Sequence, residues 1–138
     1  MIKTGNEIRT DIYNLIVGST LASSVNGQVY FDGTRPRDSA KEDIIVIFTT
    51  GFTDQVQEGT VTVNIYVPDI QYVANGVLVE DIGRTNTISR AAQNWVDSLK
   101  ARYTEYQFKL RTAISTGEEP DLHQHFVHVR LGYRLYNG

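Results

Sequence analysis

Three histidines lie close together near the C-terminus of the chain, at His123, His125 and His128. His123 and His125 share a face if a strand begins that early, because side chains two residues apart in a strand point the same way. Such a pair can hold a divalent metal ion, with Asp121 as the nearest carboxylate. His128 has the opposite parity and cannot join them without a bulge. We interpret the three as polar residues of a hairpin strand and expect no metal site.

Among the acidic residues, the neighbours Glu42–Asp43 and Glu80–Asp81 could form catalytic carboxylate pairs. Within a strand, neighbours point to opposite faces, so these pairs indicate solvated charges rather than a catalytic carboxylate dyad. The sequence has no Gly-x-Ser-x-Gly elbow, no phosphate-binding loop and no cysteine. Thiolate catalysis and cysteine-ligated zinc are therefore excluded, and no motif predicts an enzyme or a cofactor.

Charges of both signs alternate in the polar segment 33–43, which contains Arg35, Arg37, Asp38, Lys41 and Glu42. A phosphate site is one alternative for its cations. Mixed-sign loops are more typical of solvent or of a subunit interface, where rim charges set the register. We therefore predict a surface loop at an interface, and expect reversal of both arginines to weaken assembly while the subunit stays folded.

The final segment, 125–136, alternates as a half-buried strand does. Arg130, Arg134 and Tyr136 share its polar face, and arginine and aromatic residues are enriched at protein interfaces. An ordinary amphipathic strand facing solvent is the alternative. The candidate interface residues are Arg35, Arg37, Asp38, Lys41, Glu42, Arg130, Arg134 and Tyr136.

Two helices are predicted to position these residues, over residues 6–17 and about 85–103, because apolar residues recur there at helical spacing. Thr4 or Asn6 is the expected N-cap of the first helix, and Thr85 or Asn86 that of the second. The second stripe contains Trp95 and ends at Tyr103. No element is predicted with certainty over residues 70–83.

Strands are predicted at 29–31, 44–48, 61–67, 106–114 and 125–136, with turns over 51–58 and 117–121. The continuous apolar run 44–48 indicates a central strand covered on both faces. Grouped strands with helices between the groups predict a single α+β domain over residues 1–138, with two helices packed on a mainly antiparallel sheet of about four or five strands. The expected core packs Ile8, Ile12, Leu15, Trp95, Val96 and Leu99 on Ile45, Ile47, Val63, Ile65, Val129 and Leu131.

Composition limits the classes of partner. The chain has 138 residues, a formal net charge of -3 and a pI near 5.5, which argues against non-specific nucleic-acid binding. No apolar run approaches the roughly 20 residues of a membrane span, so we expect no membrane partner. Residues 1–5 lack the apolar core of a secretion signal.

The order of segments carries a resemblance to a known family. A Gly-x-Val-Tyr sequence at 27–30 follows the first helix, a valine-rich strand covers Val61–Val67, and the chain closes with Val127–Arg134 after an amphipathic helix. This layout resembles the tail completion or tail terminator proteins of tailed bacteriophages and related prophage proteins. The likeness covers nearly the whole chain as element order and hydrophobic pattern.

The resemblance implies an α+β subunit that forms a homo-oligomeric ring, a hexamer by family resemblance, at the head-proximal end of the tail. The ring stops tube polymerisation and joins the tail to the head connector, without catalysis or a cofactor. It implies contacts with tail tube and head-connector proteins, with DNA passing through a pore without sequence-specific binding. The implied location is the virion, with assembly in the cytoplasm of the bacterial host.

Two alternatives remain open from the sequence. One is another phage neck or head-tail joining protein of the same assembly class. The other, from a different class, is a small metal-dependent hydrolytic enzyme that uses His123, His125 and nearby acids. The oligomeric state separates them, because a stable ring favours assembly proteins and a monomer with bound metal favours an enzyme.

Overall fold

The computed structural model describes residues 2–74, 76–101 and 105–136. Their elements run α1 (Gly5–Ile16), α2 (Thr20–Ser23), β1 (Val29–Phe31), β2 (Ile44–Phe52), β3 (Val56–Pro68), α3 (Ile82–Ala101), β4 (Tyr106–Leu110), β5 (Ser115–Glu119), a 3₁₀ helix (Pro120–Leu122) and β6 (Gln124–Tyr136). The expected helical position Tyr103 lies outside the described residues.

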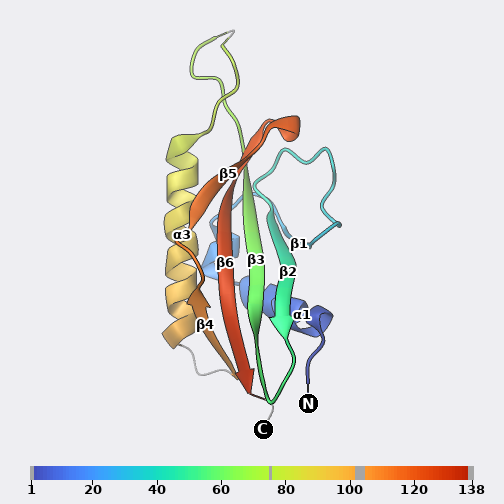
Figure 1. Cartoon of the computed structure of the whole chain (residues 1–138). Helices are drawn as coiled ribbons and strands as arrows, with labels where there is room; N and C mark the ends of the chain where they lie inside the picture. Colours follow the sequence, from blue (N-terminus) through green and yellow to red (C-terminus); the bar gives the residue numbers. More distant parts are fainter. Residues whose placement is uncertain (1, 75, 102–104, 137–138) are drawn as a thin grey trace.

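The six strands form one mainly antiparallel sheet in the order β1-β2-β3-β6-β4 (Figure 1). β1 pairs with β2 in parallel, and β5 pairs with β6 beyond the end of β4. β3 and β6 have 13 residues each and pair along their whole length, from Val56 opposite Tyr136 to Pro68 opposite Gln124. The α+β class predicted from the pattern is confirmed, with one more strand than the upper expectation.

Both long helices lie on one face of the sheet, as their apolar stripes predict. The Thr4 cap of α1 is confirmed: its side chain accepts from the Glu7 N–H, and the Glu7 carboxylate accepts from the Thr4 N–H. The predicted cap of α3 is wrong. That helix begins at Ile82, and the Asp81 carboxylate accepts from the Arg84 N–H at 3.2 Å, while Thr85 is buried inside the helix.

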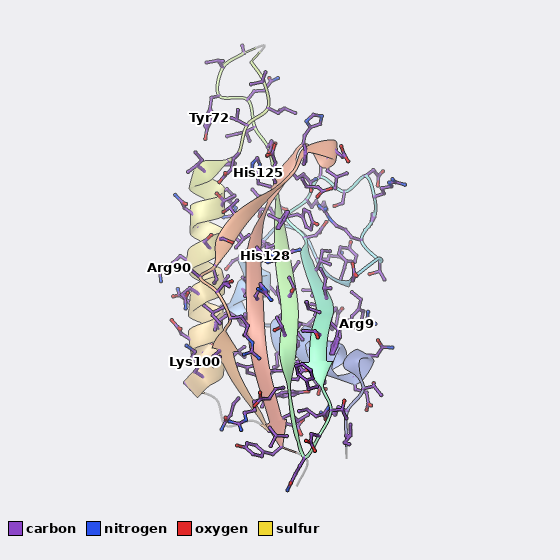
Figure 2. The ribbon with its side chains drawn as sticks, viewed as in Figure 1. Arg9, Tyr72, Arg90, Lys100, His125 and His128 are labelled. Carbon is purple, nitrogen blue, oxygen red and sulfur yellow. The ribbon has the colours of Figure 1, made fainter. Side chains whose placement is uncertain are left out.

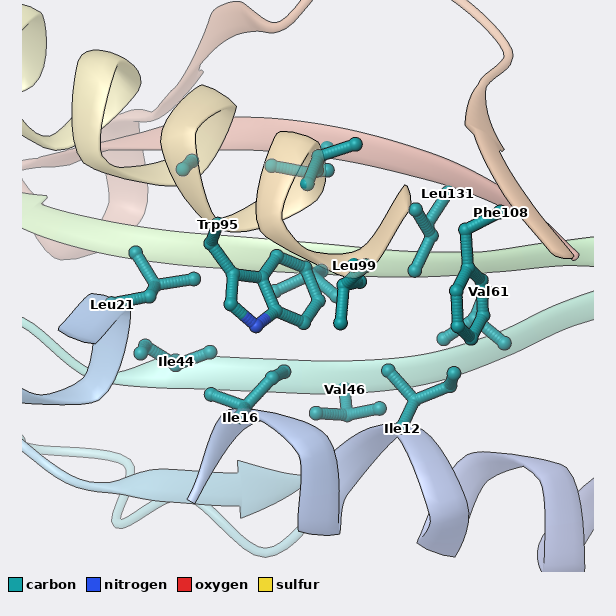
Figure 3. Packing of buried hydrophobic residues seen from close by; sticks show 14 of the residues in the cluster. Ile12, Ile16, Leu21, Ile44, Val46, Val61, Trp95, Leu99, Phe108 and Leu131 are labelled. Carbon is teal, nitrogen blue, oxygen red and sulfur yellow. The ribbon is translucent and has the colours of Figure 1, made fainter. Parts of the chain in front are cut away.

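The core between the helices and the sheet is centred on Trp95, which is 2% exposed and lies among Leu21, Ile44 and Leu99 (Figure 3). The alternating side chains of β6 that were predicted to be buried are all in this core. They are Val127, Val129, Leu131, Tyr133 and Leu135.

The prediction that Ile45 and Ile47 face the helices is wrong. Ile44 and Val46 belong to the core, and they pair with Ile65 and Val63 of β3. Because residues 44–48 are all apolar, the sequence there has no period of two that would assign a face. The register with β3 makes that assignment.

Turns are shorter than expected because the strands run further. β2 continues to Phe52 and β3 begins at Val56, so only residues 53–55 separate them. The predicted strand 106–114 stops at Leu110, and β5 takes up residues of the predicted tip. The tip itself is the 3₁₀ helix, and His123 closes it with a left-handed φ of 52°.

The opposite face of the sheet is partly uncovered in the part of the chain that the structure describes. The segment 33–43 lies beside its upper end, next to β2, whereas the strands below face the viewer without a helix in front (Figure 1). Between β3 and α3, residues 69–74 and 76–81 project beyond the sheet as an arm. Its only strand-like pairing among the described residues is a bridge between Ile70 and Val79.

We predict that Trp95→Ala lowers the free energy of unfolding by about 3–5 kcal/mol, because deletion of a large buried aromatic side chain leaves a cavity. Denaturant melts measure this loss. Trp95→Phe is the matched control. The indole N–H is buried and has no hydrogen-bond partner among the described residues, so the smaller ring also removes an unsatisfied donor, and we expect a smaller loss. A loss below roughly 1 kcal/mol for the alanine variant contradicts this packing.

Candidate interaction surface

Arg35 is held inside the protein by several groups, although it was predicted to lie at an interface. Its Nε lies 2.8 Å from the Asp43 carboxylate, and its Nη2 donates to the Gln124 side chain at 3.0 Å and to the Lys41 carbonyl at 3.1 Å. The guanidinium carbon also lies 4.3 Å from the centre of the Tyr66 ring. These contacts fix the segment 33–43 against the start of β6.

Glu42 is also buried, and it forms a two-point ion pair with Arg84 near the start of α3. The Arg84 Nε and Nη2 lie 2.6 and 2.8 Å from the two carboxylate oxygens. Asn26 adds a reciprocal pair of bonds, since its N–H donates to the Glu42 carboxylate and its side chain accepts from the Glu42 N–H. The ion pair therefore joins three separate segments of the chain.

The expectation that Glu42 and Asp43 are solvated charges is wrong, because they are 5% and 1% exposed. Hydrogen bonds from Arg84 hold the pKa of Glu42 below its usual value, against the opposing effect of burial. Burial alone would raise the pKa of Asp43, but hydrogen bonds from Ser39, Arg35 and the Gln28 N–H outweigh it and lower the pKa. Both carboxylates are structural anions that stabilise the fold.

The remaining candidates of this loop are at the surface. Arg37, Asp38 and Lys41 are exposed, and Arg37 lines a hollow of about 510 Å³ together with Asp32 and Asp121. Reversal of Arg35 would break a buried ion pair, which costs several kcal/mol. The two arginines of this loop therefore have different roles, and only Arg37 is available to a partner.

The polar face of β6 forms a basic surface with β4. Arg134 lies 3.1 Å from the Glu58 carboxylate and 5.3 Å from the Tyr136 ring centre, with side chains of Arg134 and Glu58 about half exposed. Lys109 and Arg111 project from β4 and its end beside them.

These side chains surround a hollow of about 240 Å³ above Gly132, which we call the basic hollow. A Cβ at Gly132 would lie only 2.6 Å from the Arg111 Nε, so the glycine allows that side chain to cross the sheet. Arg111 then donates to the Gly59 carbonyl at 3.0 Å. The lining residues are Glu58, Gln107, Phe108, Lys109, Arg111, Gly132, Tyr133 and Arg134.

Lys109 and Arg111 were not among the predicted site residues. Their alternation with Phe108 and Leu110 places them on the polar face of a strand, which the sequence does indicate. Their position beside Arg134 depends on the register of β4 with β6, where Gln107 pairs with Arg134 and Lys109 with Gly132. That pairing joins residues far apart in the sequence, so it has no local signal.

The three histidines lie in different surroundings. His123 precedes β6 in a left-handed conformation, so it does not share a strand face with His125 as considered from the sequence. His125 Nδ1 lies 2.6 Å from Asp69, and its Nε2 lies 3.9 Å from Glu80. His128 Nδ1 lies 2.7 Å from the Asn64 side chain, and burial, with the charge of Arg130, lowers its pKa. Among the described residues, no group of three or more His, Asp or Glu is placed to hold a metal ion.

The outer part of the arm, residues 70–79, is apolar and uncharged. Residues 70–79 contain no Asp, Glu, Lys or Arg, and Tyr72, Val73 and Val77 are 62%, 68% and 80% exposed. Figure 2 shows Tyr72 on this projecting segment, away from the sheet. Exposed apolar groups gathered in one place mark contact sites more often than free surface.

Compared with models of known protein families and with curated protein sequences, the chain matches none. None of the helices formed by the described residues is long and apolar enough to cross a membrane. The resemblance to phage tail proteins therefore stays a prediction, and any proposal of function depends on the residues and their geometry.

We predict that acid destabilises the protein partly through Glu42 and Asp43. Because their pKa values are lower in the folded state, their contribution is present above the unfolded values near 4.5 and 3.8 and is lost as the pH falls below them. Urea melts measure the free energy of unfolding between pH 7 and pH 3. At pH 7 we expect a lower value for Asp43→Asn than for wild type. Between pH 7 and pH 3 we expect it to fall less in the variant than in wild type. Exposed Asp38→Asn is the control. Equal pH dependence in all three proteins contradicts the assignment.

Proposed function

We propose that this chain is a structural protein of the bacteriophage head-tail junction, similar to tail terminator or tail completion proteins. In this proposal it forms a homo-oligomeric ring on the head-proximal end of the tail tube and contacts the head connector. It acts by binding other proteins, without catalysis or a cofactor.

The observation that carries the proposal is the arm over residues 69–81. A subunit with no partner gains nothing from a projecting segment whose outer part, residues 70–79, is uncharged and exposes Tyr72, Val73 and Val77. Burial of apolar area supplies the free energy of most protein association. An assembly subunit uses such a segment for contacts made only in the particle.

The uncovered face of the sheet supports the same function. Alternating strands of a two-layer α+β fold leave one face for solvent or for a partner. Here that face carries Arg134 and Tyr136, residue types enriched at interfaces. Next to them, Phe52 at the β2–β3 turn is 76% exposed. Contact residues therefore lie at both ends of the elongated sheet.

Another phage neck protein is the nearest alternative, and inactivation of the gene in its phage separates the two. Loss of a terminator should give tails of irregular or excessive length, because nothing stops tube growth. Loss of a neck protein should give tails of normal length that do not join heads. Tail lengths in electron micrographs of lysates are the measurement, and a wild-type copy supplied in trans is the control.

The enzyme alternative relies on His125, which contacts Asp69 and approaches Glu80. Native mass spectrometry reports both the number of subunits and any bound metal. We expect a ring without stoichiometric metal. A monomer with one metal ion, lost in His125→Ala, would contradict the proposal.

We further predict that Val77→Asp weakens assembly and leaves the subunit folded. The side chain is 80% exposed, so the free energy of unfolding should change by no more than about 0.5 kcal/mol. A charge there would oppose burial of the arm in a partner. Sedimentation velocity measures self-association into the ring and binding to tail tubes. Ile2→Asp, at another exposed apolar residue, is the control. If Val77→Asp self-associates and binds tubes as wild type does, the arm is not part of either interface.

A further inference from the structure

The basic hollow is strongly charged in a chain that is acidic overall. Of the 13 basic and 16 acidic residues, Lys109, Arg111, Arg130, Arg134 and Glu58 lie on this part of the sheet face. The rest of the chain therefore holds nine basic and fifteen acidic residues. Neither Lys109 nor Arg111 forms an ion pair within the described ranges.

An acidic tip lies at the other end of the same sheet. Glu118, Glu119 and Asp121 follow one another around the end of β5 and the 3₁₀ helix, and Pro120 restricts the backbone between them. None of the three carboxylates forms an ion pair within the part of the chain that the structure describes. Arg37 lies beside the tip in a shared hollow, where Asp32 offsets its charge.

The tip cannot reach the hollow of its own subunit. Glu119 pairs with Gln124 of β6, and Lys109 pairs with Gly132. Eight residues of strand separate these positions, which is about 26 Å at roughly 3.3 Å per residue. Side chains of lysine and glutamate together do not span that distance, so any pairing of these charges joins two copies.

We propose that the acidic tip of one copy, formed by Glu118, Glu119 and Asp121, docks on the basic hollow of the next copy, formed by Lys109, Arg111 and Arg134. This inference rests on the proposed ring and names its subunit contact. The two surfaces are different patches of one chain, so the contact is heterologous. Heterologous contacts build closed rings when the rotation between copies closes.

A protein carboxylate surface fits the hollow better than the phosphates of DNA. The hollow is confined to about 240 Å³. A DNA backbone needs a line of cations along its track. Along β3 the face continues with Thr60, Thr62 and Asn64 instead, as neutral residues. The compact tip exposes the carboxylates of Glu118 and Asp121, and the small hollow presents Lys109 and Arg111 beside the Arg134–Glu58 pair.

Charge reversal tests the contact. Lys109→Glu with Arg134→Glu reverses the hollow, and Glu118→Lys with Asp121→Lys reverses the tip. We expect each variant alone to raise the dissociation constant of assembly at least about tenfold at low salt, because like charges would face each other. An equimolar mixture should restore assembly in alternating order, since each reversed surface then meets its complement. Sedimentation velocity with the folded proteins measures both effects.

Controls come from the polar face of α3, where Lys100 and Asp97 are exposed. Lys100→Glu and Asp97→Lys change the net charge in the same directions, by half as much, away from both surfaces and should assemble as wild type does. Circular dichroism melts check that every variant is folded. Added salt should weaken wild-type assembly and reduce the differences between variants.

The outcomes separate this contact from the proposed function. Rings that form with unchanged affinity in both reversed variants would overturn the contact and leave the ring in place. A wild-type protein that stays monomeric at every concentration and salt would overturn both. Binding of a short duplex DNA that only the hollow variant loses, with assembly unchanged, would assign the hollow to nucleic acid and overturn the contact.

Discussion

The pairing of β3 with β6 is the constraint on which the rest of the structure depends. These two strands share 13 consecutive pairs, and β2, β4 and β5 are each aligned by pairing with one of them. A slip of one residue would move every side chain of a strand to the other face. It would bury Arg130 and His128 among the helices and expose Val129 and Leu131. Because that exchange would cost much free energy, only one register is stable. The register in turn determines which charged residues share the uncovered face of the sheet.

Buried ion pairs connect the irregular segments to this pair of strands. Arg35 contacts both Asp43, next to β2, and Gln124, the first residue of β6. Arg84 joins Glu42 to the start of α3. Such pairs add little net stability compared with apolar packing, but loss of one partner leaves a buried charge and is costly. Their main effect here is to select one position for the loop 33–43 and for the base of the arm.

Local patterns predicted those features that depend on local periodicity. The stripe around Trp95, the alternation of β6 and the Thr4 cap all follow from neighbours within a few residues. Local periodicity did not predict which side chains of Ile44–Phe48 face the helices. The run is uniformly apolar, so either set of alternating side chains could face the core, and pairing with β3 decides between them. The role of Arg35 also could not be predicted, since its partner Gln124 is 89 residues away. For the same reason the sequence did not show that Lys109 and Arg111 lie beside Arg134, since only the register of β4 with β6 brings them together.

An elongated sheet with its helices on one side separates the stability of the subunit from its association. The core around Trp95 and the buried ion pairs contain the groups that stabilise the monomer. The charged side chains of the acidic tip and the basic hollow are not among them, although Phe108 and Tyr133 line the hollow from the core side. Contact surfaces at the ends of a rigid sheet stay a fixed distance apart, because every strand between them is hydrogen-bonded to its neighbours. A subunit with this arrangement can present an acidic surface to one neighbour and a basic surface to the next without a change of fold. In the proposed assembly, long-range attraction between the charged surfaces orients the encounter of two subunits, and burial of the apolar arm stabilises the complex.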